Sequence, residues 1–219
     1  MNYETPRSVE DAVALLVADQ NARVLAGGTD LLVRLRAGQI APSAIIDIKR
    51  IDQMRVITQE DNGFRIGAAV TGAEMSEHAD LKAAWPGVVE ATDLIGSTQV
   101  QGRATAVGNL CNAGPAADSV PALVAACATV RIAGPKGMRD AAVEDIPTAP
   151  GKTSLARGEF ITSFFLPSRP ANSADAYLRF IPRTEMDIAV VGCAVSLTLD
   201  AGGTITQARV SLGAVAPKV

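Results

Sequence analysis

Hydrophobic residues at the start of the chain first follow helical spacing and then form short apolar runs. Ser8 precedes a helical pattern built on Val9, Ala12 and Leu16, and Ser8 with Asp11 predicts an N-terminal capping box. The next segments have the patterns of a strand, a helix and a strand, at 22–26, 31–36 and 44–48. This order predicts a small parallel α/β unit at the N-terminus.

From Met54 onward the pattern mixes strands and helices. Two short strands around Asn62 and Gly63 predict a hairpin, and Pro86 with Gly87 separates two helical patterns. The remaining patterns predict helices at 74–84, 88–95 and 120–128, and strands at 129–133, 159–166, 188–199 and 205–214. A local parallel unit followed by hairpins and separate helices predicts an α+β fold.

Composition narrows the class of protein. The chain has 219 residues, of which 48% are hydrophobic and 20% charged, so it can bury a core and is not disordered. Its net charge of -3 argues against a broad nucleic-acid surface. The three cysteines lie far apart, which indicates a reducing compartment and too few ligands for an ordinary iron–sulfur cluster. No signal peptide or membrane-spanning run is visible, so we expect a cytoplasmic protein.

The first candidate site is the turn that follows the strand at 22–26. Gly27, Gly28 and Thr29 stand between that strand and the next helix, where free backbone N–H groups can bind a pyrophosphate. We expect Asp30 to cap the helix rather than touch phosphate, because a carboxylate repels it. The alternative is a plain strand-to-helix turn.

The second candidate is the segment 103–122, which combines small residues with many hydrogen-bonding side chains. Gly108 and Gly114 leave room for a ligand to approach the backbone. The polar side chains are Thr105, Asn109, Asn112, Asp118 and Ser119. Such a loop suits a large polar cofactor, and the alternative is an ordinary Asn/Gly/Pro-rich surface turn.

The sequence lacks the motifs of common nucleotide-binding, zinc-binding and hydrolytic sites. The chain has no G-x-G-x-x-G, and Ile146 stands where a P-loop before Gly151-Lys152-Thr153 needs glycine, so we interpret that stretch as a loop. The single histidine, His78, is expected to be an exposed helix residue, which makes a zinc site or a hydrolytic triad improbable. Any chemistry would therefore depend on a bound cofactor.

Two arginines in the segment 177–189 leave two interpretations open. Arg179 or Arg183 beside a flavin would stabilise negative charge on the reduced ring. The alternative is a solvated arginine paired with Glu185 or Asp187.

Together these segments resemble the flavin-binding subunit of the molybdenum hydroxylases, the family of carbon monoxide dehydrogenase and xanthine dehydrogenase. The resemblance lies in Leu25–Leu31, Thr105–Pro121, Gly158–Pro167, Tyr177–Ala189 and Val210–Pro217. It implies a two-lobed FAD-binding domain of the vanillyl-alcohol-oxidase type, followed by a truncated C-terminal β-sheet section. The implied boundaries are 1–54 and 55–170 for the two FAD-binding lobes and 171–219 for the C-terminal section.

The resemblance also implies roles for individual residues. The first turn would wrap the FAD pyrophosphate, the central segment would hold phosphate, ribityl and ring, Asp118 would bond the sugar, Ile161 would lie along the isoalloxazine, and Arg179 would stand beside it. The implied FAD-binding residues are Leu25, Ala26, Gly27, Gly28, Thr29, Asp30, Leu31, Gly96, Thr105, Gly108, Asn109, Asn112, Asp118, Ile161 and Arg179. No side chain is expected to act as a catalytic nucleophile or base, and no metal is expected on this chain.

Two departures from the family pattern have consequences. Val107 replaces a glycine of the family, and we expect it to strain the loop if that position needs positive φ. Relatives continue past Val219 into helices that cover the last sheet, so we expect exposed apolar strand surface here.

The implied function is electron transfer in an oxidoreductase complex. Electrons would come from [2Fe–2S] clusters on a small partner subunit, pass through FAD, and leave to an external acceptor, while a large molybdopterin subunit oxidises the substrate. Two alternatives stay open, a stand-alone FAD-dependent oxidase and a non-catalytic assembly module that has lost FAD.

Overall fold

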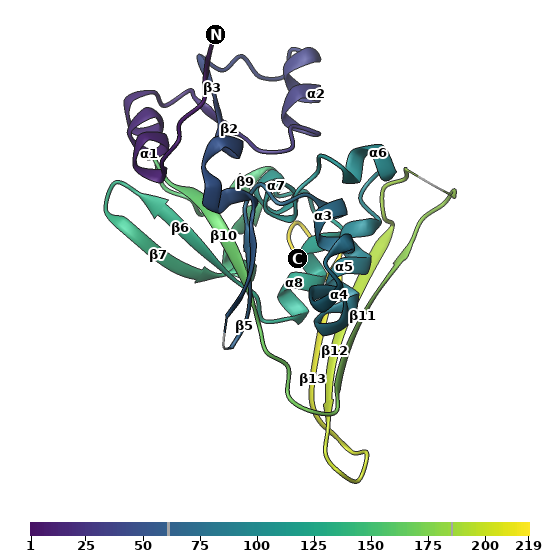
Figure 1. Ribbon diagram of the computed structural model, residues 1–219. Coiled ribbons are helices and arrows are strands. Elements are labelled where there is room, and N and C mark those ends of the chain that lie inside the picture. Colours follow the sequence, from purple (N-terminus) through teal and green to yellow (C-terminus); the bar gives the residue numbers. More distant parts are fainter. Residues whose placement is uncertain (61, 185) are drawn as a thin grey trace.

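The chain folds into a small N-terminal lobe and two larger antiparallel sheets with helices between them. A computed structural model describes residues 1–60, 62–184 and 186–219. Figure 1 shows the N-terminal lobe at one end, and the helices α3, α4, α5 and α8 between the five-stranded and the three-stranded sheet. The predicted α+β class is confirmed. Asp61 of the expected hairpin turn and Glu185, one of the acids expected beside Arg183, lie outside the described residues.

The N-terminal lobe is a parallel sheet in the order β1-β3-β2 with two helices. Its elements are β1 (Asn2–Glu4), α1 (Val9–Ala18), β2 (Arg23–Leu25), α2 (Leu31–Arg36), β3 (Ala44–Asp47) and the 3₁₀ turns η1 (Ile48–Arg50) and η2 (Asp52–Arg55). Ser8 caps α1, since its side chain accepts a hydrogen bond from the Asp11 N–H, but the reciprocal bond of the predicted capping box, from the Ser8 N–H to the Asp11 carboxylate, is not made. Strand β1 was not predicted, because its three residues show no apolar pattern.

The central part is an antiparallel sheet in the order β4-β5-β10-β6-β7. Its strands are β4 (Ile57–Glu60), β5 (Gly63–Gly67), β6 (Thr129–Gly134), β7 (Gly137–Ala142) and β10 (Phe160–Pro167), and the turn η3 (Val143–Asp145) leads to a two-stranded sheet of β8 (Pro147–Ala149) and β9 (Lys152–Thr153). Ile66, Val130 and Phe164 form the core on one face of the five-stranded sheet. Helices cover this face, so the opposite face meets solvent.

Six short helices connect the sheets. They are α3 (Gly72–Glu77), α4 (Ala79–Ala84), α5 (Pro86–Asp93), α6 (Thr98–Gln101), α7 (Ala106–Asn112) and α8 (Ser119–Ala125). The single helix predicted at 74–84 is wrong, because His78 has an extended backbone and its Nδ1 caps α4 by accepting from the Leu81 N–H. His78 is also half-buried rather than exposed. Pro86 and Gly87 do not separate two helices but form the first turn of α5, where proline fits.

The last sheet consists of β11 (Ser173–Phe180), β12 (Val191–Leu199) and β13 (Ile205–Gly213), paired antiparallel in that order. One face packs on α5 and α8, where Tyr177 and Ala194 are buried. The other face is exposed and apolar, as expected, with Leu178, Phe180 and Val210 on it. Within the described ranges, no helix combines the length and hydrophobicity needed to cross a bilayer.

Candidate functional site

A cavity of about 450 Å³ lies where the N-terminal lobe meets α7 and the start of β10. Both predicted segments reach it, although they are far apart in the sequence. The predicted residues that line it are Leu25, Ala26, Gly27, Gly28, Thr29, Asp30, Leu31, Thr105, Gly108, Asn109, Asn112 and Ile161. The structure therefore brings the two glycine-bearing segments together around one concave site.

The first turn approaches the second segment so closely that only glycine fits. A Cβ on Gly27 would lie 1.9 Å from the carbonyl oxygen of Arg103, and Gly28 has a φ of +79°. The backbone N–H groups of Gly27, Gly28 and Thr29 have no acceptor among the described residues. Adjacent free N–H groups in a turn form an anion-binding concavity.

Asp30 does not cap α2, which corrects the sequence prediction. Its side chain makes no capping bond, and its Oδ1 accepts a hydrogen bond of 3.1 Å from Nδ2 of Asn112. This bond joins the two segments across the cavity mouth. Burial there raises the pKa of Asp30, and the charge of Arg34 offsets part of that shift.

The sequence predicts a loop for the central segment, but this prediction is wrong for its first part, which forms the helix α7. The Thr105 side chain caps it by accepting from the Gly108 N–H at 2.9 Å, and a Cβ on Gly108 would lie 2.8 Å from that hydroxyl. Val107 sits inside the helix with its side chain buried, so the strain expected from positive φ does not arise. The helix presents Gly108, Asn109 and Asn112 to the cavity.

Asn109 is fixed in orientation by the start of α8. Its Oδ1 accepts hydrogen bonds from the Ser119 hydroxyl at 2.7 Å and from the Ser119 N–H at 3.3 Å. Because the oxygen is used, its amide nitrogen is the group available to a ligand. Asn109 can therefore act as a positioned donor at this wall.

Lys49, which was not predicted as a site residue, binds the backbone just before the first turn. Lys49 Nζ donates to the carbonyl oxygen of Ala26 at 3.0 Å and to Oδ1 of Asp47 at 2.7 Å. Asp47 also accepts a hydrogen bond from the Tyr3 hydroxyl and is buried at the end of β3. This Lys49 bridge ties the turn to the parallel sheet.

Three of the predicted site residues do not line the cavity: Gly96, Asp118 and Arg179. Gly96 has a φ of +64° and follows Ile95, which does line it. Asp118 accepts hydrogen bonds of 3.0 Å from both the Tyr177 hydroxyl and Arg179. Burial raises the pKa of Asp118, and Arg179 and Tyr177 lower it by less. The solvated alternative for Arg179 is wrong, because its side chain is buried, while Arg183 does pair with Asp187 in solvent.

Other lining residues come from places with no local sequence pattern. They include Arg23, Arg34, Cys111, Gly151, Thr153 and Glu159. The stretch 151–153 was interpreted as a loop, yet Lys152 and Thr153 form β9. Burial raises the pKa of Cys111 to about 12, so its thiol stays protonated at neutral pH.

The cavity is suited to binding rather than to acid–base or nucleophilic chemistry. His78 does not line it, and within the described part of the chain no cluster of three potential metal ligands exists. Its groups are backbone N–H donors, amides, hydroxyls and apolar side chains such as Ile161, together with the carboxylates of Asp30 and Glu159, which already accept hydrogen bonds from Asn112 and Arg139. Reactive chemistry at this site would have to come from what is bound.

Comparison with family models covers nearly the whole chain. A model described as the FAD binding domain in molybdopterin dehydrogenase matches residues 1–169, and one described as the CO dehydrogenase flavoprotein C-terminal domain matches residues 176–219. The putative xanthine dehydrogenase FAD-binding subunit of Escherichia coli K12 is 33% identical over 99% of this chain and 74% of its own length. The carbon monoxide dehydrogenase medium chain of Hydrogenophaga pseudoflava is 31% identical over 98% and 75%.

Solved structures have the same architecture. Carbon monoxide dehydrogenase from Hydrogenophaga pseudoflava superposes with a TM-score of 0.94 at 32% identity, over 100% of this chain and 76% of that chain. Quinoline 2-oxidoreductase from Pseudomonas putida 86 gives a TM-score of 0.91 at 26% identity, over 100% and 75%.

Proposed function

The chain belongs to the family of FAD-binding subunits of the molybdenum hydroxylases, and from this premise we propose that it binds one FAD in the cavity between the first turn and α7. The observation that carries the proposal is the row of free N–H groups at Gly27, Gly28 and Thr29, which faces α7 across the cavity. These donors fit a pyrophosphate, whose oxygens need several hydrogen bonds at once.

The remaining lining residues fit the rest of such a molecule. Asn109 offers an amide donor, Asn112 joins α7 to Asp30, and Ile161 supplies apolar surface for a flat ring. We assign Gly96, Asp118 and Arg179 to the region beyond the cavity, with Arg179 near the ring and Asp118 near the sugar. Arg179 bonds Asp118 through one nitrogen only, which leaves its other nitrogens available.

We further propose that FAD supplies reversible electron storage between a [2Fe–2S] subunit and an external acceptor. A large molybdopterin subunit would complete the complex and oxidise the substrate. Support comes from the solved relatives, one of which is described as a Cu,Mo-CO dehydrogenase. The chain's part is to bind the flavin, orient it and bury it, since the carboxylates that line the cavity, Asp30 and Glu159, already accept hydrogen bonds from Asn112 and Arg139.

The same proposal includes three structural units and a location. The units are the two FAD-binding lobes, 1–54 and 55–170, and the C-terminal section, 171–219. A cytoplasmic location is supported by three cysteines that form no disulfide among the described residues.

Direct titration tests the binding site. FAD added to the flavin-free chain should bind at one equivalent, followed by flavin fluorescence. Thr29→Val should weaken binding about tenfold by removing a hydroxyl donor near phosphate, while Thr206→Val on β13, outside the cavity, should leave it unchanged. Absence of binding, or equal loss in both variants, would contradict the proposed site.

Purification from the native host tests the assembly. Flavin, iron and molybdenum should co-purify with the chain in the soluble fraction. A flavin-loaded chain that turns over substrate without any partner would identify a stand-alone oxidase instead.

A further inference from the structure

A second concave site lies on the solvent face of the five-stranded sheet. We call it the arginine hollow, and define it by Thr58, Arg65, Arg131, Arg139, Asp140 and Ser163. Its volume is about 510 Å³. Strand pairing places Gly67, Ser163, Arg131 and Asp140 in one row across β5, β10, β6 and β7.

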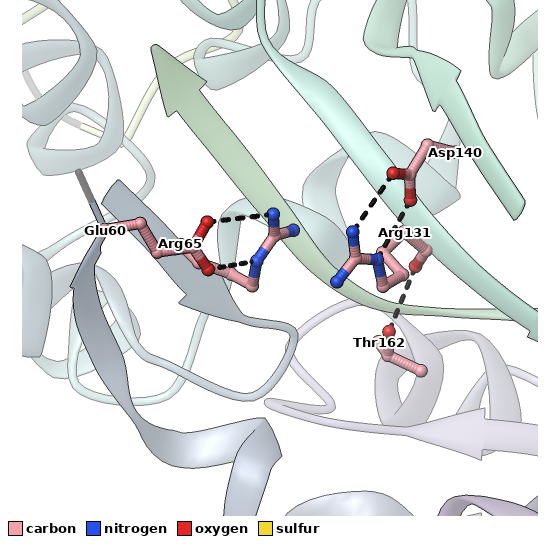
Figure 2. Close-up of polar contacts among 5 residues, drawn as sticks. All are labelled: Glu60, Arg65, Arg131, Asp140 and Thr162. Atoms are coloured by element: carbon pink, nitrogen blue, oxygen red, sulfur yellow. Dashed lines mark hydrogen bonds and ion pairs between the residues drawn. The ribbon is translucent and has the colours of Figure 1, made fainter. Parts of the chain in front are cut away.

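Two arginines of the hollow are held in fixed orientation by carboxylates. Arg65 bonds Glu60 through Nε at 2.6 Å and Nη2 at 3.2 Å, and Arg131 bonds Asp140 through the same two nitrogens at 3.0 and 3.1 Å. The third nitrogen, Nη1, of each has no acceptor among the described residues. Figure 2 shows that these two nitrogens point toward each other across β10. Two cationic groups thus converge on one gap.

The charges that line the hollow are mainly positive. Arg65, Arg131 and Arg139 line it, whereas Asp140 is its only lining carboxylate among the described residues. Glu60 and Glu159 pair with Arg65 and Arg139 from outside the lining. The Arg65–Glu60 and Arg131–Asp140 pairs also interact electrostatically. The pKa of Arg131 is raised chiefly by its bond to Asp140 and further by Glu60, and Arg65 adds to the lowering of the Asp140 pKa by Arg131.

A hydroxyl group in the hollow also lacks a partner. Ser163 is only 6% exposed, and its side chain makes no hydrogen bond to any described residue. It lies between Gly67 and Arg131, next to the gap between the two guanidinium groups. Cross-strand ion pairing explains the Arg131–Asp140 contact, but it does not explain why two unpaired guanidinium nitrogens converge beside an unpaired hydroxyl that stays accessible to a ligand.

We propose that the arginine hollow binds the phosphate group of a small molecule. Arginine recognises phosphate through several parallel N–H donors, and a neighbouring hydroxyl can donate to a further oxygen. The carboxylates behind the arginines hold them in place and thereby lower the entropy cost of binding.

The hollow is separate from the cavity proposed for FAD, although one strand contributes to both. Ile161 of β10 lines the cavity, and Thr162 and Ser163 line the hollow. The register of β10 against β6 shifts between Ile161 and Ser163, and the Thr162 hydroxyl donates to the carbonyl of Arg131 at 3.2 Å (Figure 2). Such bulges redirect side chains near sites. The inference therefore does not depend on flavin binding.

Calorimetric titration tests the hollow in the chain saturated with FAD. Inorganic phosphate and, separately, ADP should bind at one equivalent. Equal affinities would assign the hollow to the phosphate group alone, and tighter ADP binding would assign it to a nucleotide. Binding should weaken with added salt, as expected for a partly exposed ionic site.

Variants connect that binding to the hollow. Arg131→Lys keeps the charge but loses the planar fork, and Ser163→Ala removes the free hydroxyl, so each should weaken binding about fivefold or more. Arg183→Lys, on an exposed pair outside the hollow, should bind as wild type. No saturable binding, or binding unchanged in Arg131→Lys and Ser163→Ala, would overturn the proposal. Flavin absorbance recorded on the same samples reports separately whether FAD is bound.

Discussion

A side chain at position 27 would need space already filled by the backbone of the second segment. We expect Gly27→Ala to lower the free energy of unfolding by about 2 kcal/mol and to weaken FAD binding, because the Arg103 carbonyl cannot move without shifting α7. Urea denaturation and FAD titration measure both effects. Gly102→Ala is the matched control, since a Cβ at Gly102 would lie 3.7 Å from its nearest neighbour, the Gln99 carbonyl oxygen, and the φ of Gly102 is -65°. Equal effects in the two variants would mean that the close approach at Gly27 carries no special cost.

Lys49 joins the first turn to the buried Asp47, so its substitution should affect both stability and FAD binding. Lys49→Met should lower the free energy of unfolding by about 2 kcal/mol, because Asp47 would stay buried without its cationic partner. FAD affinity should fall as well, since the Ala26 carbonyl loses its donor. Lys49→Arg should restore part of the affinity, and Lys82→Met, exposed on α4, should change neither quantity. Wild-type affinity in Lys49→Met would show that the bridge does not position the turn.

The same bridge predicts a pH dependence. Burial alone would raise the pKa of Asp47, but hydrogen bonds from Lys49 and Tyr3 outweigh it and leave the pKa below 3.8. A lowered folded-state pKa stabilises the protein above the unfolded value, and this stability is lost as pH falls through the folded value. The stability difference between wild type and Lys49→Met should therefore shrink below about pH 3.8. Chemical denaturation of both proteins at pH 3 and pH 6 measures this stability difference. The same difference at both pH values would contradict the prediction.

At the scale of elements, one buried ion pair fastens the last sheet to the helices. Arg179 of β11 and Asp118 before α8 are both largely buried, and Tyr177 shares the carboxylate. Arg179→Gln should cost about 3 kcal/mol because it leaves Asp118 buried with only Tyr177. Adding Asp118→Asn should restore part of that loss, so that the double-mutant cycle gives about 2 kcal/mol of coupling. Strictly additive losses in urea denaturation would contradict a coupled pair.

Elements with strong apolar patterns were predictable, and weak ones were not. Strands β6, β10, β12 and β13 lie close to their predicted ranges, because burial on a core face imposes apolar residues at regular positions. Strand β7 has no such pattern, since most of its residues are exposed at the sheet edge. The helix break at His78 depends on the cap that its side chain provides for α4. The inclusion of Pro86 and Gly87 in α5 depends on close packing of Gly87 against β11. The spacing of apolar residues reports neither.

The candidate site was predictable only where residues cluster in the sequence. The segments around Gly27 and Thr105 are dense in glycine and polar side chains, and both line the cavity. Thr153 and Glu159 line the cavity, and Lys49 binds the carbonyl of Ala26 beside it. The fold brings these residues to the site from distant parts of the chain, and their local sequences carry no distinguishing pattern. The helical form of α7 also escaped prediction, because its Asn and Gly residues favour turns while its Thr105 cap and buried Leu110 favour the helix.

At the scale of the whole molecule, the outward face of the last sheet exposes several large apolar side chains. Leu178 is 76% exposed and Val210 is 62% exposed, on strands that flank β12. Contiguous apolar surface of this kind promotes association. We therefore expect the isolated chain to self-associate with rising concentration in sedimentation velocity. Leu178→Lys should keep it monomeric while changing the free energy of unfolding by only about 0.5 kcal/mol, since the side chain has little to lose in the folded chain.

Gln207→Lys separates the effect of the face from the effect of charge. It adds the same charge to β13, but strand alternation places residue 207 with Arg209 and Ser211, opposite to Val210. We expect Gln207→Lys to self-associate like the wild type. If both lysine variants are monomeric, net charge rather than the apolar face controls association. If neither is, the chains associate through another surface, such as the free edge of β13, whose unpaired backbone groups can pair with a second strand.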